Sequence, residues 1–160
     1  MNKILFICSA FALTACGFHL KGTQGITQPL PYRDWQIVNG GILHGPLETA
    51  LLRADGRAVG AADAQAQIAL TSVVTHRDIY TITYAAEVNE YRLSLNVEAQ
   101  ASAGGQNLGE PMRVSVQRTI NYTNSEVLGK AEEEQTVWAE MRADAAGQIV
   151  RRLSFLKVPH

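Results

Sequence analysis

Cysteine is scarce in this sequence of 160 residues, and neither sign of charge is in excess. The two cysteines, Cys8 and Cys16, both lie near the start, so they form neither a disulfide scaffold nor a zinc site. The formal net charge of -1 lacks the basic excess that nucleic-acid binding normally requires. Apolar residues make up 46% of the chain, which is enough for the core of one domain and argues against general disorder.

Motifs for metal binding and catalysis are also missing. The histidines are scattered, without an HExxH pattern: His19, His44, His76 and His160. No GxSxG motif occurs, and Gly104-Gly105 is not followed by the Lys-Ser/Thr pair of a phosphate-binding loop. The run Glu132-Glu133-Glu134 fits a solvated helix face. We therefore expect no enzymatic activity and no metal. The only cofactor that we expect is a covalent lipid, which the first residues of the sequence indicate.

The first sixteen residues have the pattern of a bacterial lipoprotein signal peptide. Lys3 precedes an apolar run over residues 4–13, which at about ten residues is too short to cross roughly 30 Å of hydrocarbon. Leu13-Thr14-Ala15-Cys16 then matches the lipobox, in which the cysteine thiol receives the lipid. We predict removal of residues 1–15 and lipidation of Cys16. The alternatives are a buried N-terminal helix ending in a free cysteine, or a secretory signal that is cut without lipidation.

Lipidation at Cys16 determines the expected location. One acyl chain binds a membrane only marginally, whereas several chains hold a protein firmly. Gly17 stands where an Asp is the usual signal for retention in the inner membrane of enteric bacteria. We expect the outer membrane, with the protein on its periplasmic side. Residues 16–31 are rich in Gly, Thr, Gln and Pro and are expected to form a tether, followed by a single domain over residues 32–160.

Apolar periodicity predicts the elements of this domain. A strand is expected over residues 35–38 and a helix over 46–54, with Pro46 in its first turn and Gly56 after its end. The clearest strand covers residues 90–100, where five apolar residues alternate with polar ones. Another is expected over 112–122, interrupted by Arg118, and one over 67–75 with Ile68, Leu70, Ser72 and Val74 on one face. Residues 104–107 are expected to form a hairpin loop.

A long helix is expected to close the chain. Thr123 and Glu126 have capping-box spacing, and apolar residues recur every three or four positions from Trp138 to Leu156, before Pro159. The order strand-helix-strand-strand-strand-helix predicts an α+β fold. We expect a two-layer sandwich in which two helices pack on one face of an approximately four-stranded, mostly antiparallel sheet.

Three basic residues are candidate ligand contacts. Arg113 and Arg118 lie in the strand that leads to the last helix, and Lys130 lies near the start of that helix. Such groups can hold phosphates or sugar acids. The alternative is ordinary solvated charge with local ion pairs, for which Glu126 and Lys130 have suitable spacing.

Several motifs together resemble the lipopolysaccharide-assembly lipoprotein family, LptE. The motifs are Cys16-Gly17-Phe18-His19-Leu20, Gly45-Pro46-Leu47, Glu90-Tyr91, Glu140-Met141-Arg142 and Arg151-Arg152-Leu153. The resemblance implies a plug inside the outer-membrane β-barrel LptD, which the plug helps to assemble, and a shared role in inserting lipopolysaccharide at the cell surface.

The same resemblance bears on ligand contacts. Lys130 matches a basic position of the family that is linked to lipopolysaccharide, whereas a second such position falls near Tyr84, where this sequence has no Arg or Lys. The alternative is an unrelated, periplasm-facing lipoprotein that acts as a binding module without a barrel partner.

Overall fold

The computed structural model describes residues 28–82, 84, 88–121 and 127–157. Several sequence predictions lie outside these residues: the signal peptide, Cys16, most of the tether, the capping residues Thr123 and Glu126, and Pro159. The described elements are β1 (Asp34–Val38), the 3-10 turn η2 (Gly41–Leu43), α2 (His44–Arg53), β2 (Arg57–Ala58), β3 (Ala66–Ile82), β4 (Val88–Ala103), β5 (Gln106–Asn107), β6 (Met112–Asn121) and α3 (Val127–Leu153).

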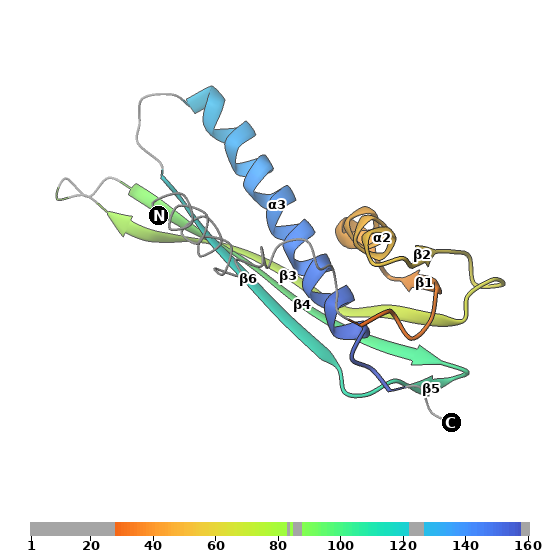
Figure 1. The fold of residues 1–160 in the computed structure, drawn as a ribbon. Helices are drawn as coiled ribbons and strands as arrows, with labels where there is room; N and C mark the ends of the chain where they lie inside the picture. Colours follow the sequence, from red (N-terminus) through yellow and green to blue (C-terminus); the bar gives the residue numbers. More distant parts are fainter. Residues whose placement is uncertain (1–27, 83, 85–87, 122–126, 158–160) are drawn as a thin grey trace, which may run out of the picture.

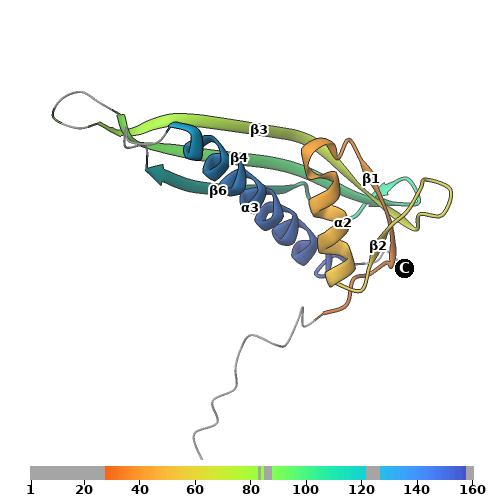
Figure 2. The ribbon, with the colours of Figure 1, turned by 90° about the horizontal axis from the view of Figure 1, so that it is seen from above.

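The structure confirms the predicted α+β class. The strand order is β2-β1-β3-β4-β5, and β6 pairs with β4. Both helices lie on the same face of this sheet (Figure 1, Figure 2). The sheet has six strands rather than about four. The prediction missed β2 and β5, because each contains only two residues and two residues show no periodicity. It is mixed, since β1 runs parallel to both β2 and β3 while the other pairs are antiparallel.

The predicted one-sided burial is confirmed for β4 and β6. Their apolar residues of one parity are buried beneath the helices: Leu93, Leu95, Val97 and Ala99 in β4, and Met112, Val114, Val116 and Ile120 in β6. From α3 the core receives Met141, Ala145, Ala146, Ile149, Val150 and Leu153. The opposite parity is polar and forms the outer face of the sheet, which neither helix covers.

The prediction for β3 is wrong in its second half. Ile68 and Leu70 are buried as expected, but Val74 is exposed and Val73 packs against the core instead. The cause is a β-bulge: Leu70 pairs with Ala99 and Ser72 with Glu98, which leaves Thr71 as an extra residue. One extra residue reverses the inward parity for the rest of the strand.

The helix boundaries shift slightly from the prediction. Helix α2 begins at His44, and Pro46 still lies in its first turn, where a missing N–H costs no hydrogen bond. Beyond its end, Asp55 takes the left-handed conformation with φ 59°, and the Gly56 N–H donates to the Leu51 carbonyl over 2.9 Å. Helix α3 ends at Leu153 rather than at Leu156, although Leu156 still packs against the core.

Gly147 lies inside α3 and lowers the stability of the helix, although no close neighbour requires a glycine there. A Cβ built at this position meets nothing within 4 Å, so alanine fits without a shift of any neighbour. Glycine in a helix interior costs about 1 kcal/mol relative to alanine. We expect Gly147→Ala to raise the free energy of unfolding by up to about 1 kcal/mol. Denaturant unfolding followed by circular dichroism measures this change, and a loss of stability would contradict it.

Side chains at the start of β1 join this strand to its neighbours. The Gln65 Oε1 atom accepts hydrogen bonds from the backbone N–H groups of Arg33 and Asp34, at 3.0 and 3.2 Å. Asp34 is paired with Arg57 in the β1–β2 register, and the Arg57 Nε–H donates to the Asp34 carboxylate. This hydrogen bond, together with the charge of Arg57, holds the pKa of Asp34 below its ordinary value of 3.8.

The lowered pKa makes the contribution of this pair depend on pH. A carboxylate with a lowered folded-state pKa stabilises the fold above its ordinary pKa, and the effect is lost as the pH falls through the folded-state value. We expect Asp34→Asn to lower the free energy of unfolding at neutral pH, and the difference from the unchanged protein to shrink below pH 3.8. Urea unfolding at both pH values tests this, and a difference independent of pH would contradict it.

Candidate interaction surface

The sheet extends well beyond the hydrophobic core at one end. Strand β1 pairs with β3 only over residues 66–69 of β3. Beyond them, residues 74–80 of β3 are all exposed. We call residues 74–82 of β3, with the paired residues 88–92 of β4 and 118–121 of β6, the distal sheet. Figures 1 and 2 show it reaching past β1 and α2, with only the first half of α3 above it.

Polar contacts connect α3 to the distal sheet. The Arg77 Nε atom lies 3.4 Å from Glu134 Oε2, and the Arg77 guanidinium stacks 3.8 Å from the centre of the Tyr91 ring. From α3, the Trp138 Nε1–H donates to Glu134 Oε1 over 3.3 Å. Ile120 is still buried here, and Tyr91 and Trp138 pack against the core, so these polar contacts add to the apolar packing that holds the two layers together.

The tip of the distal sheet, by which we mean Ile79, Tyr80 and Ile82 of β3 with Tyr84 just beyond it, exposes large apolar side chains. Ile79 is 58% exposed, Ile82 is 62% exposed and Tyr84 is fully exposed. Tyr80 is half-exposed, and the Arg92 guanidinium stacks on its ring at 4.0 Å. Ile79 pairs with Tyr91 and Tyr80 stacks with Arg92, so exposed apolar side chains lie on both faces of the tip. Exposed apolar surface of this kind can mark a site of contact with another molecule. The sequence prediction missed this tip because the expected strand ended at residue 75, although the β-branched residues that follow favour a longer strand.

The structure brings two of the three predicted basic residues to the same side of the sheet. Lys130 Nζ donates to the Asn121 carbonyl over 3.0 Å and pairs with Glu133 Oε2 at 3.1 Å. Arg118, three residues before Asn121, reaches Asp144 of α3 at 3.2 Å. Both cations therefore lie on the α3 side.

Arg113 is separated from this pair. It belongs to the opposite parity of β6 and lies on the outer face, where its Nε is 2.8 Å from Glu98 Oε1 of the facing strand. Each of the three basic side chains has a carboxylate partner, so an anionic ligand would have to compete with an existing ion pair. The local ion pairs that the sequence left open as an alternative are present, with Glu133 as the described partner of Lys130.

The outer face of the sheet is broad and hydrophilic. Beside Arg113, it carries uncharged polar side chains of one parity of β4 and β6: Asn96, Gln100, Ser115, Gln117, Thr119 and Asn121. Within the described part of the chain, no strand pairs with the free edge of β6. This face offers hydrogen-bond donors and acceptors to a polar neighbour.

The described residues do not assemble a metal site or a nucleophile site. They contain no group of three or more His, Cys, Asp or Glu side chains that could hold a metal ion. Ser72, Ser94, Ser102 and Ser115 all lie in strands, and Ser102 accepts a hydrogen bond from Gln67 over 2.8 Å. No helix among the described residues is long and apolar enough to cross a membrane.

Solved structures of bacterial lipoproteins share this two-layer α+β architecture, which defines the fold class of the chain. One is a lipoprotein B from Nitrosomonas europaea, with a TM-score of 0.69 and 24% identity over 86% of this chain and 90% of that one. Another is a minor lipoprotein from Acinetobacter baumannii, with a TM-score of 0.67 and 20% identity over 82% of this chain and all of that one. At these identities the likeness establishes the fold.

The chain belongs to the LptE family. The family model described as LptE, lipopolysaccharide-assembly, matches residues 36–153. The LPS-assembly lipoprotein LptE of Pectobacterium atrosepticum is 32% identical over 151 residues, which is 90% of this chain and 80% of that protein. The protein of the same name from Photorhabdus laumondii is 30% identical over 93% of this chain and 83% of its own length. These matches confirm the predicted family.

Proposed function

We propose that this protein is an outer-membrane lipoprotein that plugs the LptD β-barrel and assists its assembly, and so takes part in the transport and insertion of lipopolysaccharide. Lipidation of Cys16 and the outer-membrane location belong to the same proposal. The observation that carries it is the distal sheet, which extends past the core with a polar outer face and an apolar tip. The relatives named LPS-assembly lipoprotein support the lipopolysaccharide role.

The geometry suits a plug better than a catalyst. The lumen of an outer-membrane barrel is polar, and it can be filled by a folded domain. A sheet covered by helices on one side leaves its hydrophilic face free to meet such a wall. Ion pairs between α3 and the distal sheet add to the buried contacts of Ile120, so this half of the molecule keeps its shape although most of β3 is exposed here.

Depletion of the protein tests this function directly. We expect less folded barrel and less surface lipopolysaccharide, and the two should fall together because the barrel is the route to the surface. Extraction in mild detergent should copurify the protein with a large β-barrel in equal amounts. Normal levels of both after depletion, or recovery without a barrel, would instead favour a lipoprotein binding module with no barrel partner.

A second proposal concerns direct contact with lipopolysaccharide. Lys130 and Arg118 lie on the same side of the distal sheet, and anionic groups of a ligand could replace Glu133 and Asp144 as their partners. Arg113, on the outer face, would have to act separately.

A charge reversal tests the second proposal. We expect Lys130→Glu to weaken capture of lipopolysaccharide about tenfold, because one cation is lost and an anion is added. The matched control is Arg113→Glu, which reverses a charge on the outer face and is expected to leave capture on the α3 side unchanged. The difference is measured as the amount of each purified variant that immobilised lipopolysaccharide captures. Equal capture of both variants would contradict a site at Lys130.

A further inference from the structure

Strand β6 forms an edge of the described sheet, and its pairing with β4 determines which of its backbone groups point outwards. In an antiparallel pair, residues that bond to the neighbouring strand alternate with residues that point away from it. The Ala101 carbonyl of β4 accepts from the Leu108 N–H over 2.8 Å, on the side of β4 that β5 and β6 share. Odd-numbered residues of β4 therefore bond towards β6, where they pair with even-numbered residues, as Leu95 does with Val116. The odd-numbered residues of β6 direct their N–H and carbonyl groups to the free edge.

Cationic side chains already bond to this edge. Three of them donate to backbone carbonyls of β6: Arg152 to Arg113 over 2.6 Å, Arg118 to Gln117 over 2.9 Å, and Lys130 to Asn121 over 3.0 Å. All three acceptors are odd-numbered, in agreement with the register. They stand four residues apart, so every second outward carbonyl between residues 113 and 121 has a donor. We call Arg118, Lys130 and Arg152 the edge cations.

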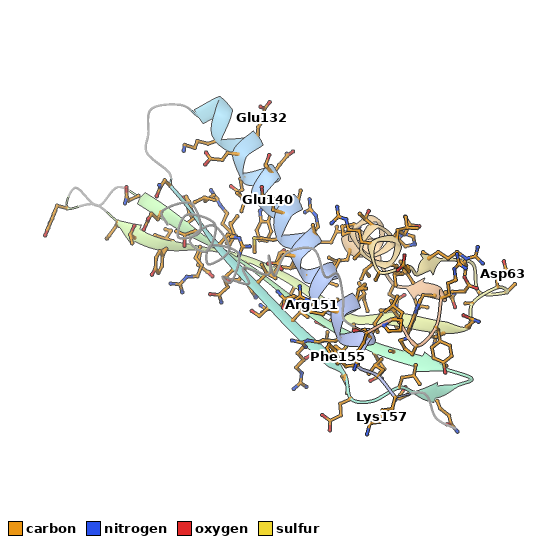
Figure 3. The ribbon with its side chains drawn as sticks, viewed as in Figure 1. Asp63, Glu132, Glu140, Arg151, Phe155 and Lys157 are labelled. Carbon is orange, nitrogen blue, oxygen red and sulfur yellow. The ribbon has the colours of Figure 1, made fainter. Side chains whose placement is uncertain are left out.

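Helix α3 runs back along β6, so that its two ends meet the two ends of the strand (Figure 1, Figure 2). Residues 130–152 of a helix span about 33 Å, and residues 113–121 of a strand span about 27 Å. Because these lengths are similar, Lys130 reaches the last outward carbonyl of β6 and Arg152 reaches the first. Glu132 projects from the side of α3 that faces away from the sheet (Figure 3), so not every charged residue of the helix turns to this edge.

The edge cation in the middle is held in place from α3. Arg118 Nη2 lies 3.2 Å from Asp144 Oδ2, while Arg118 Nη1 bonds the Gln117 carbonyl. The other carboxylate oxygen of Asp144 accepts from Gln148 Nε2 over 3.2 Å, which fixes the carboxylate. Apolar residues of α3 such as Ile149 are completely buried and already hold the helix on the sheet. The polar contacts therefore have a separate effect, which is to occupy the edge.

An edge strand of this length otherwise invites pairing with another chain. Strand β6 has ten residues, and unpaired N–H and carbonyl groups on an edge are a template for strand addition. A second copy of this chain carries the same edge, so two β6 strands could pair antiparallel across a two-fold axis. Such pairing needs the outward carbonyls as acceptors. Charged side chains on an edge strand are a general means of preventing this association.

We propose that the edge cations close β6 against pairing with a second copy of this chain and so keep the protein monomeric. The carbonyls of Arg113, Gln117 and Asn121 stay bonded to side chains of the same molecule, which leaves too few acceptors for an incoming strand. Neighbouring molecules then contact this edge through side chains rather than by extending the sheet. The inference does not rest on the proposed barrel partner.

Removal of the edge cations tests the inference. The triple variant combines Arg118→Thr, which keeps a residue that favours strands, with Lys130→Ala and Arg152→Ala, which favour the helix. Sedimentation of the purified mature protein in excess non-ionic detergent measures its self-association. We expect the unchanged protein to be monomeric. The dimer association constant of the triple variant should be about tenfold or more above the upper limit for the unchanged protein, because freed carbonyls form intermolecular hydrogen bonds.

A proline on the edge shows whether the new contact is strand pairing. The N–H of Ser115 points outwards, so Ser115→Pro removes a donor of the free edge without breaking a bond to β4. Added to the triple variant, it is expected to restore the monomer. The matched control is Arg113→Gln in the otherwise unchanged protein. The Arg113 side chain pairs with Glu98 and donates to no carbonyl of β6, so this variant should stay monomeric.

Two results would overturn the inference. A triple variant that stays monomeric with an unchanged circular dichroism spectrum would show that the edge cations only fasten α3 to β6. A dimer that persists after Ser115→Pro would be formed by another surface. If the triple variant does not fold, Lys130→Ala and Arg152→Ala are measured singly. Each opens one end of the edge and should raise self-association by a smaller factor, and monomers in both cases would also contradict the inference.

Discussion

Replacing Ile79 and Ile82 by threonine and Tyr84 by serine is expected to reduce recovery of the barrel partner about a hundredfold while leaving the domain folded. The three side chains are more than half exposed, so they contribute little to the fold as it stands. If they are buried against a partner, each contributes about 1 to 2 kcal/mol to the contact. A loss of about 3 kcal/mol corresponds to roughly a hundredfold in affinity. Threonine retains the β-branched shape that favours the strand.

Copurification from membranes, quantified against the unchanged protein, measures this loss. The matched control is Ile42→Thr, because Ile42 is also exposed but lies in η2, away from the distal sheet. The control is expected to copurify normally. Urea unfolding should show both variants within about 1 kcal/mol of the unchanged protein, as is usual for surface substitutions. Normal recovery of the barrel by the triple variant would show that the tip is not part of the interface.

Trp35→Ala is expected to lower the free energy of unfolding by about 3 to 5 kcal/mol. Trp35 is the largest side chain of the core and is completely buried in β1. Its indole Nε1–H donates to the Tyr32 carbonyl over 2.8 Å, and the Tyr32 ring meets it edge-on with centroids 5.9 Å apart. Removing the ring leaves a cavity and an unsatisfied carbonyl at the junction of β1 with the segment that precedes it. Domains of this size are stable by only about 5 to 15 kcal/mol, so the loss is a large fraction of the total.

Denaturant unfolding followed by circular dichroism measures the loss in free energy of unfolding. Trp35→Phe is the matched control, because it keeps an aromatic ring and most of the side-chain volume but loses the hydrogen bond to Tyr32. We expect it to cost clearly less than the alanine variant, in line with a net hydrogen-bond contribution of about 1 kcal/mol. Equal losses in the two variants would mean that the hydrogen bond, rather than the packing of the ring, holds this part of the core.

Much of the fold could be predicted because local periodicity and burial agree in most elements. The alternation from Tyr91 to Ala99 corresponds to one buried face of β4, and the apolar residues from Met141 to Leu153 correspond to the buried face of α3. Strand β2 and strand β5 could not be predicted, since two residues carry no period. The parallel pairing of β1 with β3 also depends on the path of the chain through α2, which periodicity does not describe.

The surface was harder to predict than the core. Arg113, Arg118 and Lys130 are close in sequence and basic, which suggested one site. The pleat places Arg113 and Arg118 on opposite faces of β6, because positions an odd number of residues apart point to opposite sides. Their carboxylate partners come from Glu98 of the adjacent strand and Asp144 of α3, which are distant in sequence. Sequence spacing alone could not identify them.

The sequence by itself determined the family and the α+β class, because both depend on patterns that are readable along the chain: the ordered motifs and the alternation of apolar residues. The tertiary structure decided which side chains face outwards. The extra residue Thr71 reverses the parity of β3, exposes Val74 and directs Arg77 towards Glu134 of α3. It also decided that Arg53 and Arg151, which are far apart in the sequence, border one hollow. The first outcome follows from the register of β3 against β4, and the second from the packing of α2 beside α3; both are non-local interactions that no single segment encodes.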